Sequence, residues 1–346
     1  MSPTSKSLTA SCHCKSIRFT IIAPADILPL KTHICHCNVC RYTHGTPCIF
    51  HATLPAGLAP QFIAPSSIDN LTAYAHAESL STRYFCSTCG CQIGDKGHDD
   101  GGWTISTSIF TEPNDGLWEI RSNCFTDSSA DGGLSTMVPR IDERQLEIFN
   151  PETNKAAEDA TNVAEAVSED LRAECHCGGV KFSISRPSEE FLASPASKGW
   201  ILAEDTSKWL ASLDLCNDCR LVNGSNVVGW LFVAKDHISP PLPRDLIIGS
   251  SKSYKSSEDV LRTFCGTCGA TVFYSCTERP DIVDAAVGIL RASEGVMAEK
   301  WALWRAGRIG SAHDGLEYDP GFTRALTEGM KIWGKEKGMP EDFQLN

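Results

Sequence analysis

At 346 residues, the chain is too long for one small domain and long enough for two of average size, each with its own core. Its formal net charge of −12 argues against a nucleic-acid partner, because phosphate binding needs clustered Lys and Arg. No apolar stretch approaches the roughly 20 residues that span a bilayer, and no signal-peptide pattern is visible. We therefore expect a soluble cytoplasmic protein with a small-molecule partner and no membrane partner, its oligomeric state left open.

The chain contains 17 cysteines, many of them in closely spaced pairs. In a reducing compartment, C-x-C and C-x-x-C pairs are more often metal ligands than disulfides. The odd count also argues against complete disulfide pairing. The sequence therefore predicts bound metal ions, and thiolate sets of this kind accept zinc or iron.

The first predicted strand follows a C-x-C pair, Cys12 and Cys14, in "ASCHCKSIRFTI" at 10–21. A distant C-x-x-C pair, Cys86 and Cys89, lies in "TRYFCSTCGC". Two such pairs, brought together from opposite ends of a small β-domain, supply the four thiolates of a structural zinc site. Buried free thiols or disulfides are the alternative, and the spacing favours zinc.

Between these pairs, "HICHCNVCRYTHG" places Cys35, Cys37 and Cys40 within six positions. Three thiolates at this spacing can bind one ion and leave its fourth position open for water or substrate, as in catalytic zinc sites. The alternative is a second structural site whose shell is closed by one of four nearby residues, His33, His36, His44 or Cys48. Spacing alone favours neither interpretation.

All three cysteine blocks occur twice, so the chain is a tandem repeat. The later blocks read "AECHCGGVKFSI", "DLCNDCRLVNG" and "LRTFCGTCGA". The middle and last blocks are offset by 179 positions and the first by 163, which places an insertion of 16 residues within 185–209. We expect one copy over 1–150, a linker rich in Ala, Glu and Asp over 151–172, and a second copy over 173–346.

The second copy repeats the four-cysteine set as Cys175, Cys177, Cys265 and Cys268. Its middle block differs from that of the first copy, because Asp214 stands where Cys35 would be, ahead of Cys216 and Cys219. Asp can bind zinc through oxygen, but an Asp-Cys-Cys set holds an ion differently from three thiolates.

Short segments that alternate apolar and polar residues, separated by Gly, Pro, Ser and Asn, favour antiparallel β-structure in both copies. Helical periodicity is convincing only near the C-terminus, in Phe322, Leu326, Met330 and Trp333. We expect a mainly β fold of two antiparallel β-domains with few short helices and a C-terminal docking helix.

The order C-x-C, C-x-C-x-x-C-R and F-C-x-x-C-G resembles the glutathione-dependent formaldehyde-activating enzyme family, whose other branch includes centromere protein V. The resemblance extends over 10–135 and 173–310. It implies a zinc-stapled β fold and a carbon–sulfur lyase of the S-(hydroxymethyl)glutathione synthase kind. It also implies a structural zinc ion on each four-cysteine set and a catalytic one on the three-cysteine set. Asp214 lies outside the family motif, so we expect the second catalytic site to be weak or empty.

In the implied reaction, a zinc-bound thiolate, that of glutathione by default, attacks formaldehyde or another small carbonyl compound. The resulting oxyanion needs a positive charge or a proton donor, and Arg41 and His44 are the nearest candidates. Both also have structural interpretations, because Arg41 recurs as Arg220 and a lone loop histidine is often a surface residue. Two further arginines, Arg83 and Arg262, precede the C-x-x-C pairs and are interpreted as structural.

Three alternatives compete with this interpretation. The lyase could be retuned to another thiol adduct of a larger metabolite. The chain could be a non-catalytic zinc scaffold that binds a protein partner, as the centromere protein V branch suggests. A redox or metal-buffering protein would instead have easily oxidised or exchangeable sites.

Overall fold

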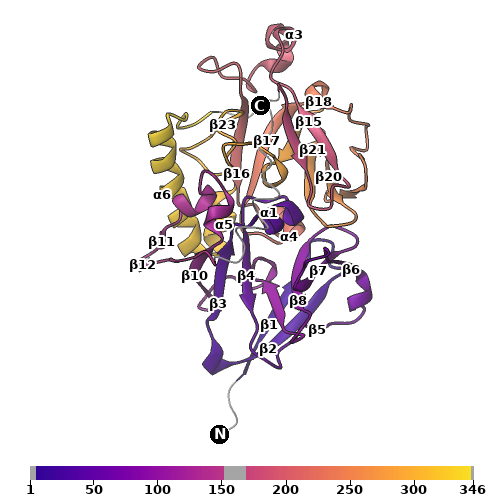
Figure 1. Cartoon of the computed structure of the whole chain (residues 1–346), viewed down its shortest axis with the longest axis vertical. Coiled ribbons are helices and arrows are strands. Elements are labelled where there is room, and N and C mark those ends of the chain that lie inside the picture. The colour runs from indigo at the N-terminus through magenta and orange to yellow at the C-terminus, as the bar shows by residue number, and fades with distance from the viewer. Residues whose placement is uncertain (1–4, 152–168, 344–346) are drawn as a thin grey trace.

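The computed structural model describes residues 5–151 and 169–343, and Figure 1 shows two β-rich halves stacked along the long axis of the molecule. Antiparallel strands dominate both halves, so the predicted mainly β fold with two copies is confirmed. Most of the predicted linker, residues 152–168, lies outside the described residues. Its last two positions belong to the first strand of the second copy, β14 (Leu171–Glu174).

The first copy is built from a small and a large sheet. Its strands are β1 (Ser5–Ser11), β2 (Arg18–Pro24), β3 (Leu30–Cys35), β4 (Ile49–Thr53), β5 (Gln61–Phe62), β6 (Leu71–Tyr74), β7 (Ser81–Cys86), β8 (Gln92–Gly97), β9 (Trp103–Ser106), β10 (Trp118–Cys124) and β13 (Glu147–Phe149). The small sheet has the order β1-β2-β5 and the large sheet the order β13-β10-β3-β4-β9-β8-β7-β6. A separate hairpin joins β11 (Arg140–Ile141) and β12 (Arg144–Gln145).

The second copy repeats this topology. After β14, its strands are β15 (Lys181–Ile184), β16 (Trp209–Asp214), β17 (Val228–Ala234), β18 (Ile238–Ser239), β19 (Ser251–Lys255), β20 (Val260–Cys265), β21 (Thr271–Cys276), β22 (Ile282–Ala286) and β23 (Ala302–Trp304). The small sheet is β14-β15-β18 and the large sheet is β19-β20-β21-β22-β17-β16-β23. Apart from β13, which has no counterpart in it, the large sheet has the order of the first copy read from the opposite edge, so the sequence repeat is also a repeat of fold.

Helices are few, as predicted. They are α1 (Asn38–His44), α3 (Glu189–Ala193), α4 (Asn217–Asn223), α5 (Ala312–Tyr318) and α6 (Pro320–Lys337). The predicted insertion contains α3, which projects at the end of the molecule opposite β1 and β2 (Figure 1). Within the described ranges, no helix combines the length and the apolar character needed to cross a membrane.

The helices α1 and α4 lie at the junction of the two copies (Figure 1). The N–H of His176 in the second copy donates to the carbonyl of Tyr42 in α1 at 3.0 Å. The N–H of His13 in the first copy donates to the carbonyl of Leu221 in α4 at 3.1 Å. The sequence repeat relates these two bonds to each other. The chain is therefore built like a symmetric dimer whose two subunits are fused.

Glycines make this close approach possible. Gly45 and Gly224 end α1 and α4 with φ angles of 76° and 68°, in the left-handed region that glycine adopts without strain. A β-carbon on Gly45 would collide with the backbone oxygen of Thr271, and one on Gly224 with that of Gln92. The helices α1 and α4, which we call the ligand helices because the predicted metal ligands Cys40 and Cys219 lie in them, therefore each end against the backbone of the opposite copy.

The predicted C-terminal docking helix is confirmed as α6, which buries Phe322, Leu326, Met330 and Trp333. The Phe322 ring packs edge-on against Phe50 in β4 at 4.8 Å between centroids. The helix cap, Asp319, accepts a hydrogen bond from the indole nitrogen of Trp118 at 2.9 Å. Because Phe50 and Trp118 belong to the first copy, α6 ties the end of the second copy to the first.

Replacing Gly224 by Ala tests the interface between the copies. Gly116 is a matched control, because its φ is 70° and a β-carbon there meets nothing within 4 Å. Gly116→Ala is expected to cost about 1–2 kcal/mol through left-handed backbone strain alone. Gly224→Ala should cost about 1–3 kcal/mol more, because the added carbon displaces the Gln92 backbone. Denaturant unfolding measures both free energies, and equal losses would contradict the described contact.

Candidate metal centres and active site

The first four-cysteine set comes together as one cluster. The sulfurs of Cys12, Cys14, Cys86 and Cys89 lie within 4.8 Å of one another, and Cys14 Sγ lies 3.5 Å from the sulfurs of both Cys12 and Cys86. A disulfide would need about 2.05 Å. Tetrahedral zinc with bonds of about 2.3 Å implies sulfur separations of about 3.8 Å. The donor set therefore fits a four-coordinate zinc ion.

The second copy holds an equivalent cluster, formed by Cys175, Cys177, Cys265 and Cys268. Cys177 Sγ lies 3.5 Å from Cys175 Sγ and 3.4 Å from Cys265 Sγ. Backbone N–H groups of Gly179, Val180 and Cys268 point at these sulfurs at 3.3–3.5 Å. Such donors stabilise negative charge on sulfur, so the loop is suited to thiolate ligands.

The three-cysteine set lies at the junction of β3 and α1. Cys35 ends β3, Cys37 caps α1 and Cys40 lies in its first turn, and the three sulfurs are within 4.8 Å of one another. Cys37 Sγ accepts a hydrogen bond from the Cys40 N–H at 3.3 Å. Unsatisfied N–H groups at a helix N-terminus favour negative charge, so this position favours thiolates.

None of the residues considered as a closing ligand joins this cluster in the described structure. His36 Nε2 is engaged with Asn123 Oδ1 at 2.9 Å. His44 Nδ1 lies 3.0 Å from the carbonyl oxygen of Cys40, and Cys48 is fully buried in the hydrophobic core. Among the residues described, the cluster therefore stops at three sulfurs.

Three imidazoles and a guanidinium surround Cys40. The His51 ring lies 6.2 Å from that of His33 and 5.7 Å from that of His44, and Arg83 Nη2 lies 3.7 Å from Cys40 Sγ. Burial lowers the pKa of all three histidines, that of His44 to about 4. All three are therefore neutral at pH 7. The sequence alone does not single out His51, because its position opposite His33 depends on strand pairing.

Arg83 and Arg262 occupy equivalent positions beside the last cysteine of each middle block. The Nη1 and Nη2 atoms of Arg262 lie 3.5 and 3.6 Å from Cys219 Sγ. Burial acts to lower the pKa of Arg262, but the Cys219 sulfur outweighs it and raises that pKa above its ordinary value. Their position in the sequence predicts a structural role for both arginines, and the structure adds a sulfur contact for each. The sequence feature that could have pointed to these contacts is the recurrence of the arginine in both copies at the offset of 179 positions.

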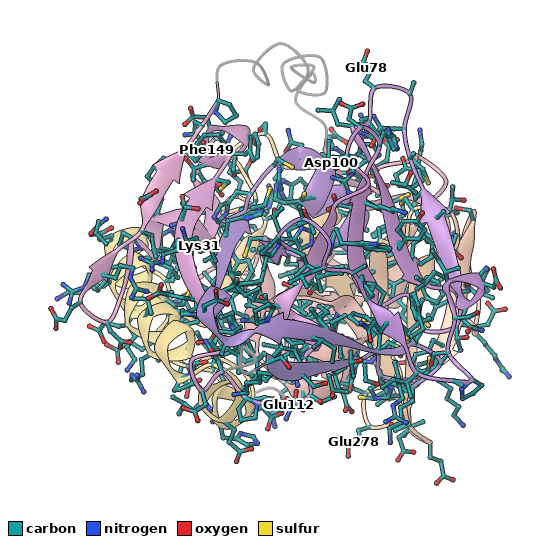
Figure 2. All side chains as sticks on the ribbon, turned by 90° about the horizontal axis from the view of Figure 1, so that it is seen from below. Lys31, Glu78, Asp100, Glu112, Phe149 and Glu278 are labelled. Atoms are coloured by element: carbon teal, nitrogen blue, oxygen red, sulfur yellow. The ribbon has the colours of Figure 1, made fainter. Side chains whose placement is uncertain are left out.

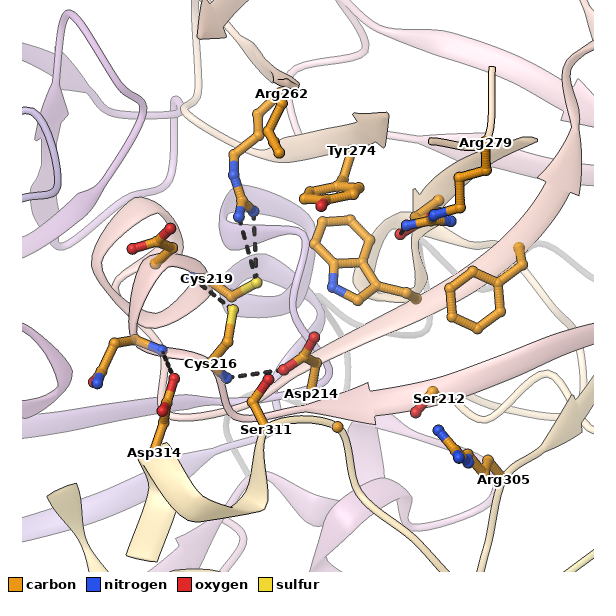
Figure 3. Close-up of a pocket in the computed structure, with 17 residues that line it drawn as sticks. Ser212, Asp214, Cys216, Cys219, Arg262, Tyr274, Arg279, Arg305, Ser311 and Asp314 are labelled. Carbon is orange, nitrogen blue, oxygen red and sulfur yellow. Dashed lines mark hydrogen bonds and ion pairs between the residues drawn. The ribbon is translucent and has the colours of Figure 1, made fainter. Parts of the chain in front are cut away.

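The mixed set of the second copy also comes together, with the ligand atoms of Asp214, Cys216 and Cys219 within 4.8 Å of one another. Asp214 ends β16 and Cys216 caps α4. A cavity of about 420 Å³ opens beside this set (Figure 3). Its walls include Arg262, Arg279, Arg305, Trp230, Phe232 and Tyr274.

Arg41 points along its own helix. Its guanidinium donates to the side-chain oxygen of Asn38 and to the Tyr42 hydroxyl. Arg220 contacts Asn217 in the same way at 3.0 Å. This shared contact supports the ligand helix in both copies, and a role for Arg41 at the substrate stays a prediction.

His44 is placed differently, because its ring is buried at the end of α1, 5.7 Å from the His51 ring between centroids. Its Nδ1 contact with the Cys40 carbonyl is mirrored by Asn223, whose Nδ2 donates to the Cys219 carbonyl at 2.6 Å. The Nε2 atom of His44 is buried and has no hydrogen-bond partner in the part of the chain that is described. The helix-end contact uses Nδ1 alone and leaves Nε2 unpaired, and a catalytic role for His44 stays a prediction.

Replacing a cysteine of a four-cysteine set should remove a metal ion and destabilise the fold. Cys268→Ser is expected to lose one zinc ion per chain and about 3 kcal/mol or more of stability, because structural zinc contributes directly to folding. Cys276→Ser is the matched control, since Cys276 belongs to no cluster and lies in the same copy. Zinc analysis and denaturant unfolding measure both effects, and an unchanged zinc content in Cys268→Ser would contradict the assignment.

Figure 2 places acidic side chains such as Glu78 and Glu278 at the outer margin of the molecule, in line with the acidic composition. Most of the clustered cysteines are buried instead, and the clusters recur in each copy. A sequence model described as "Glutathione-dependent formaldehyde-activating enzyme" matches residues 7–128 and 203–306, more than half of the chain. The second match begins after Cys175 and Cys177. The two matched regions fall on the two structural copies, and the chain belongs to the glutathione-dependent formaldehyde-activating enzyme family as a tandem duplicate.

Proposed function

We propose that this chain is a zinc-dependent carbon–sulfur lyase that joins or cleaves a thiol and a small carbonyl compound at Cys35, Cys37 and Cys40. The observation that carries this proposal is a cluster of three sulfurs that no further described His, Cys, Asp or Glu completes. Zinc bound there would supply an open coordination position that captures a thiol and lowers its pKa. Glutathione and formaldehyde are the proposed pair, because the family description contains both.

The surroundings of the three-cysteine set support polar chemistry in a dry site. The three cysteines are 4–8% exposed, and electrostatic interactions strengthen where water is excluded. Arg83 places a positive charge 3.7 Å from Cys40 Sγ. This charge offsets part of the negative charge of the thiolates and favours an anionic group nearby.

Proton transfer is assigned to the imidazoles. The Nε2 atoms of His44 and His51 are buried and have no hydrogen-bond partner among residues 5–151 and 169–343. Both rings are neutral at pH 7, so each has a free nitrogen that can take the proton of an incoming thiol, and the low pKa of both makes them weak bases that release it again readily. The same group can return that proton to the oxygen of the adduct.

We also propose a cytoplasmic location. All 17 cysteines are free thiols in the structure, including eight that form the two four-sulfur clusters. Thiols in such number persist where glutathione and thioredoxin keep proteins reduced.

Zinc-dependent turnover tests the proposal directly. The zinc-loaded protein is expected to consume free thiol when glutathione and formaldehyde are supplied, and Cys37→Ser should lower the rate by about 100-fold or more, since even weaker perturbations of metal sites cost 10- to 100-fold. Cys276→Ser should keep full activity. Turnover only with another thiol and carbonyl pair would show that the lyase acts on different substrates. No zinc-dependent turnover with any pair would reject the lyase.

His44→Asn separates a chemical role from a structural one. Asn stands at this position in the second copy and makes the same contact with the backbone carbonyl, so stability should change by less than about 1 kcal/mol. The rate at saturating substrate is expected to fall by about 10²- to 10⁴-fold, because the neutral Nε2 is lost. An unchanged rate in a stable variant would assign His44 to capping alone.

A further inference from the structure

The two middle sites share one scaffold but have different surroundings. The second copy has Ser212, Trp230 and Tyr274 at the positions of His33, His51 and Asp95 in the first. Serine is much smaller than histidine, and two ionisable groups become aromatic. The cavity of about 420 Å³ adjoins this altered site.

The two middle sites also differ in how far their ligand residues are buried. In the first copy, Val39 and Phe125 pack against the three cysteines, which are all buried. In the second copy, Asp214 and Cys216 are only half-buried. The second site is therefore the more accessible one, although its sequence departs from the family motif.

We infer that Asp214, Cys216 and Cys219 form a separate metal centre whose open side takes a small carboxylate-bearing ligand in the adjoining cavity. This inference does not rest on the proposed lyase, because it concerns the other copy. It also reverses the expectation that Asp214 weakens or empties the second site.

The ligand atoms are already held in place. One carboxylate oxygen of Asp214 accepts the Cys216 N–H at 2.9 Å, and the described structure shows no hydrogen-bond partner for the other oxygen. Cys216 Sγ accepts the Cys219 N–H at 3.2 Å at the start of α4. One oxygen and two sulfurs thus converge on one point, with a donor set that zinc accepts.

The charges balance when a divalent ion is present. Asp214 and two thiolates contribute three negative charges, which a divalent ion and the guanidinium of Arg262 neutralise. Arg262 is 4% exposed, and both of its terminal nitrogens point at Cys219 Sγ (Figure 3). A buried charge needs such compensation, so the site is suited to a metal ion.

The far side of the cavity provides the carboxylate contact. Figure 3 shows Arg279 and Arg305 on one side of the cavity and Asp314 on the other. Arg279 is occupied, because it forms a two-point ion pair with the buried Asp284. Arg305 binds the half-exposed Asp342 through Nε, and its two terminal nitrogens have no hydrogen-bond partner within the described ranges. Arg305 therefore keeps two terminal N–H groups for a ligand carboxylate, although its Nε already binds Asp342.

The middle of the cavity is aromatic. Trp230 and Tyr274 lie 6.0 Å apart between ring centroids, and Phe232 adjoins them. The volume falls within the range of about 300–1,000 Å³ that small-molecule sites occupy. The walls thus match a molecule with a metal-binding donor at one end, a short apolar middle and a carboxylate at the other.

The metal part is tested in a Cys37→Ser parent, which removes the metal centre of the first copy. Asp214→Ala is expected to lose one zinc ion per chain relative to this parent, measured by native mass spectrometry. Asp214→Cys is the matched control and should keep the parental count, since a third thiolate replaces the carboxylate. An unchanged count in Asp214→Ala, or one ion more in Asp214→Cys, would show that the native set holds no metal.

The ligand part is tested with the cobalt-substituted parent, in which the closed four-cysteine sites offer no open position. 4-Mercaptobutanoate should shift the sulfur-to-cobalt absorption with an affinity about tenfold higher than that of 4-mercaptobutanol, which has the same chain but no carboxylate. Arg305→Met should remove this preference and Arg305→Lys should keep most of it, because Lys retains the positive charge. Equal affinities for the two thiols, or a preference that survives Arg305→Met, would overturn the carboxylate assignment.

Discussion

The packing of each ligand helix against the opposite copy is the constraint on which the rest of the structure depends. Two of the three ligands of each middle site lie at the N-terminal cap or in the first turn of α1 or α4. Both helices end in a glycine with a left-handed φ that packs closely against the backbone of the opposite copy. The C-x-C loops take part as well. His13, between Cys12 and Cys14, bonds Tyr254 of the second copy at 2.7 Å, and His176 bonds Tyr74 of the first at 2.6 Å. The C-x-C loop of each copy is therefore in direct contact with the opposite copy, including the helix that carries its middle-site cysteines.

Gln92 shows how direct this link is. Its side-chain amide donates to the carbonyl of Thr43 at the end of α1, and also to the carbonyl of Cys268 in the second four-cysteine set. One side chain thus joins the ligand helix of the first copy to a structural metal loop of the second. The isolated copies would lack these contacts, so the two halves are best regarded as one folding unit.

Fusion also explains why the two sites could diverge. In a symmetric homodimer, any substitution appears twice, on both sides of the interface. In this chain, one copy keeps His33 and His51 beside three cysteines, whereas the other has Ser212 and Trp230 beside Asp214. The shared strand order and helix packing preserve both sites, while their surroundings differ in charge, volume and access.

The sequence by itself determined the repeat, the family, the mainly β fold, the membership of all four candidate ligand sets and the C-terminal helix. These follow from local patterns: cysteine spacing, alternation of apolar residues, and apolar positions three or four apart in α6. Tertiary structure alone decided that Arg83 and Arg262 touch ligand sulfurs, that His51 joins His33 and His44, and that the cavity adjoins Asp214. The physical reason is that these contacts join residues tens of positions apart, whose distances depend on strand pairing and on the packing of one copy against the other.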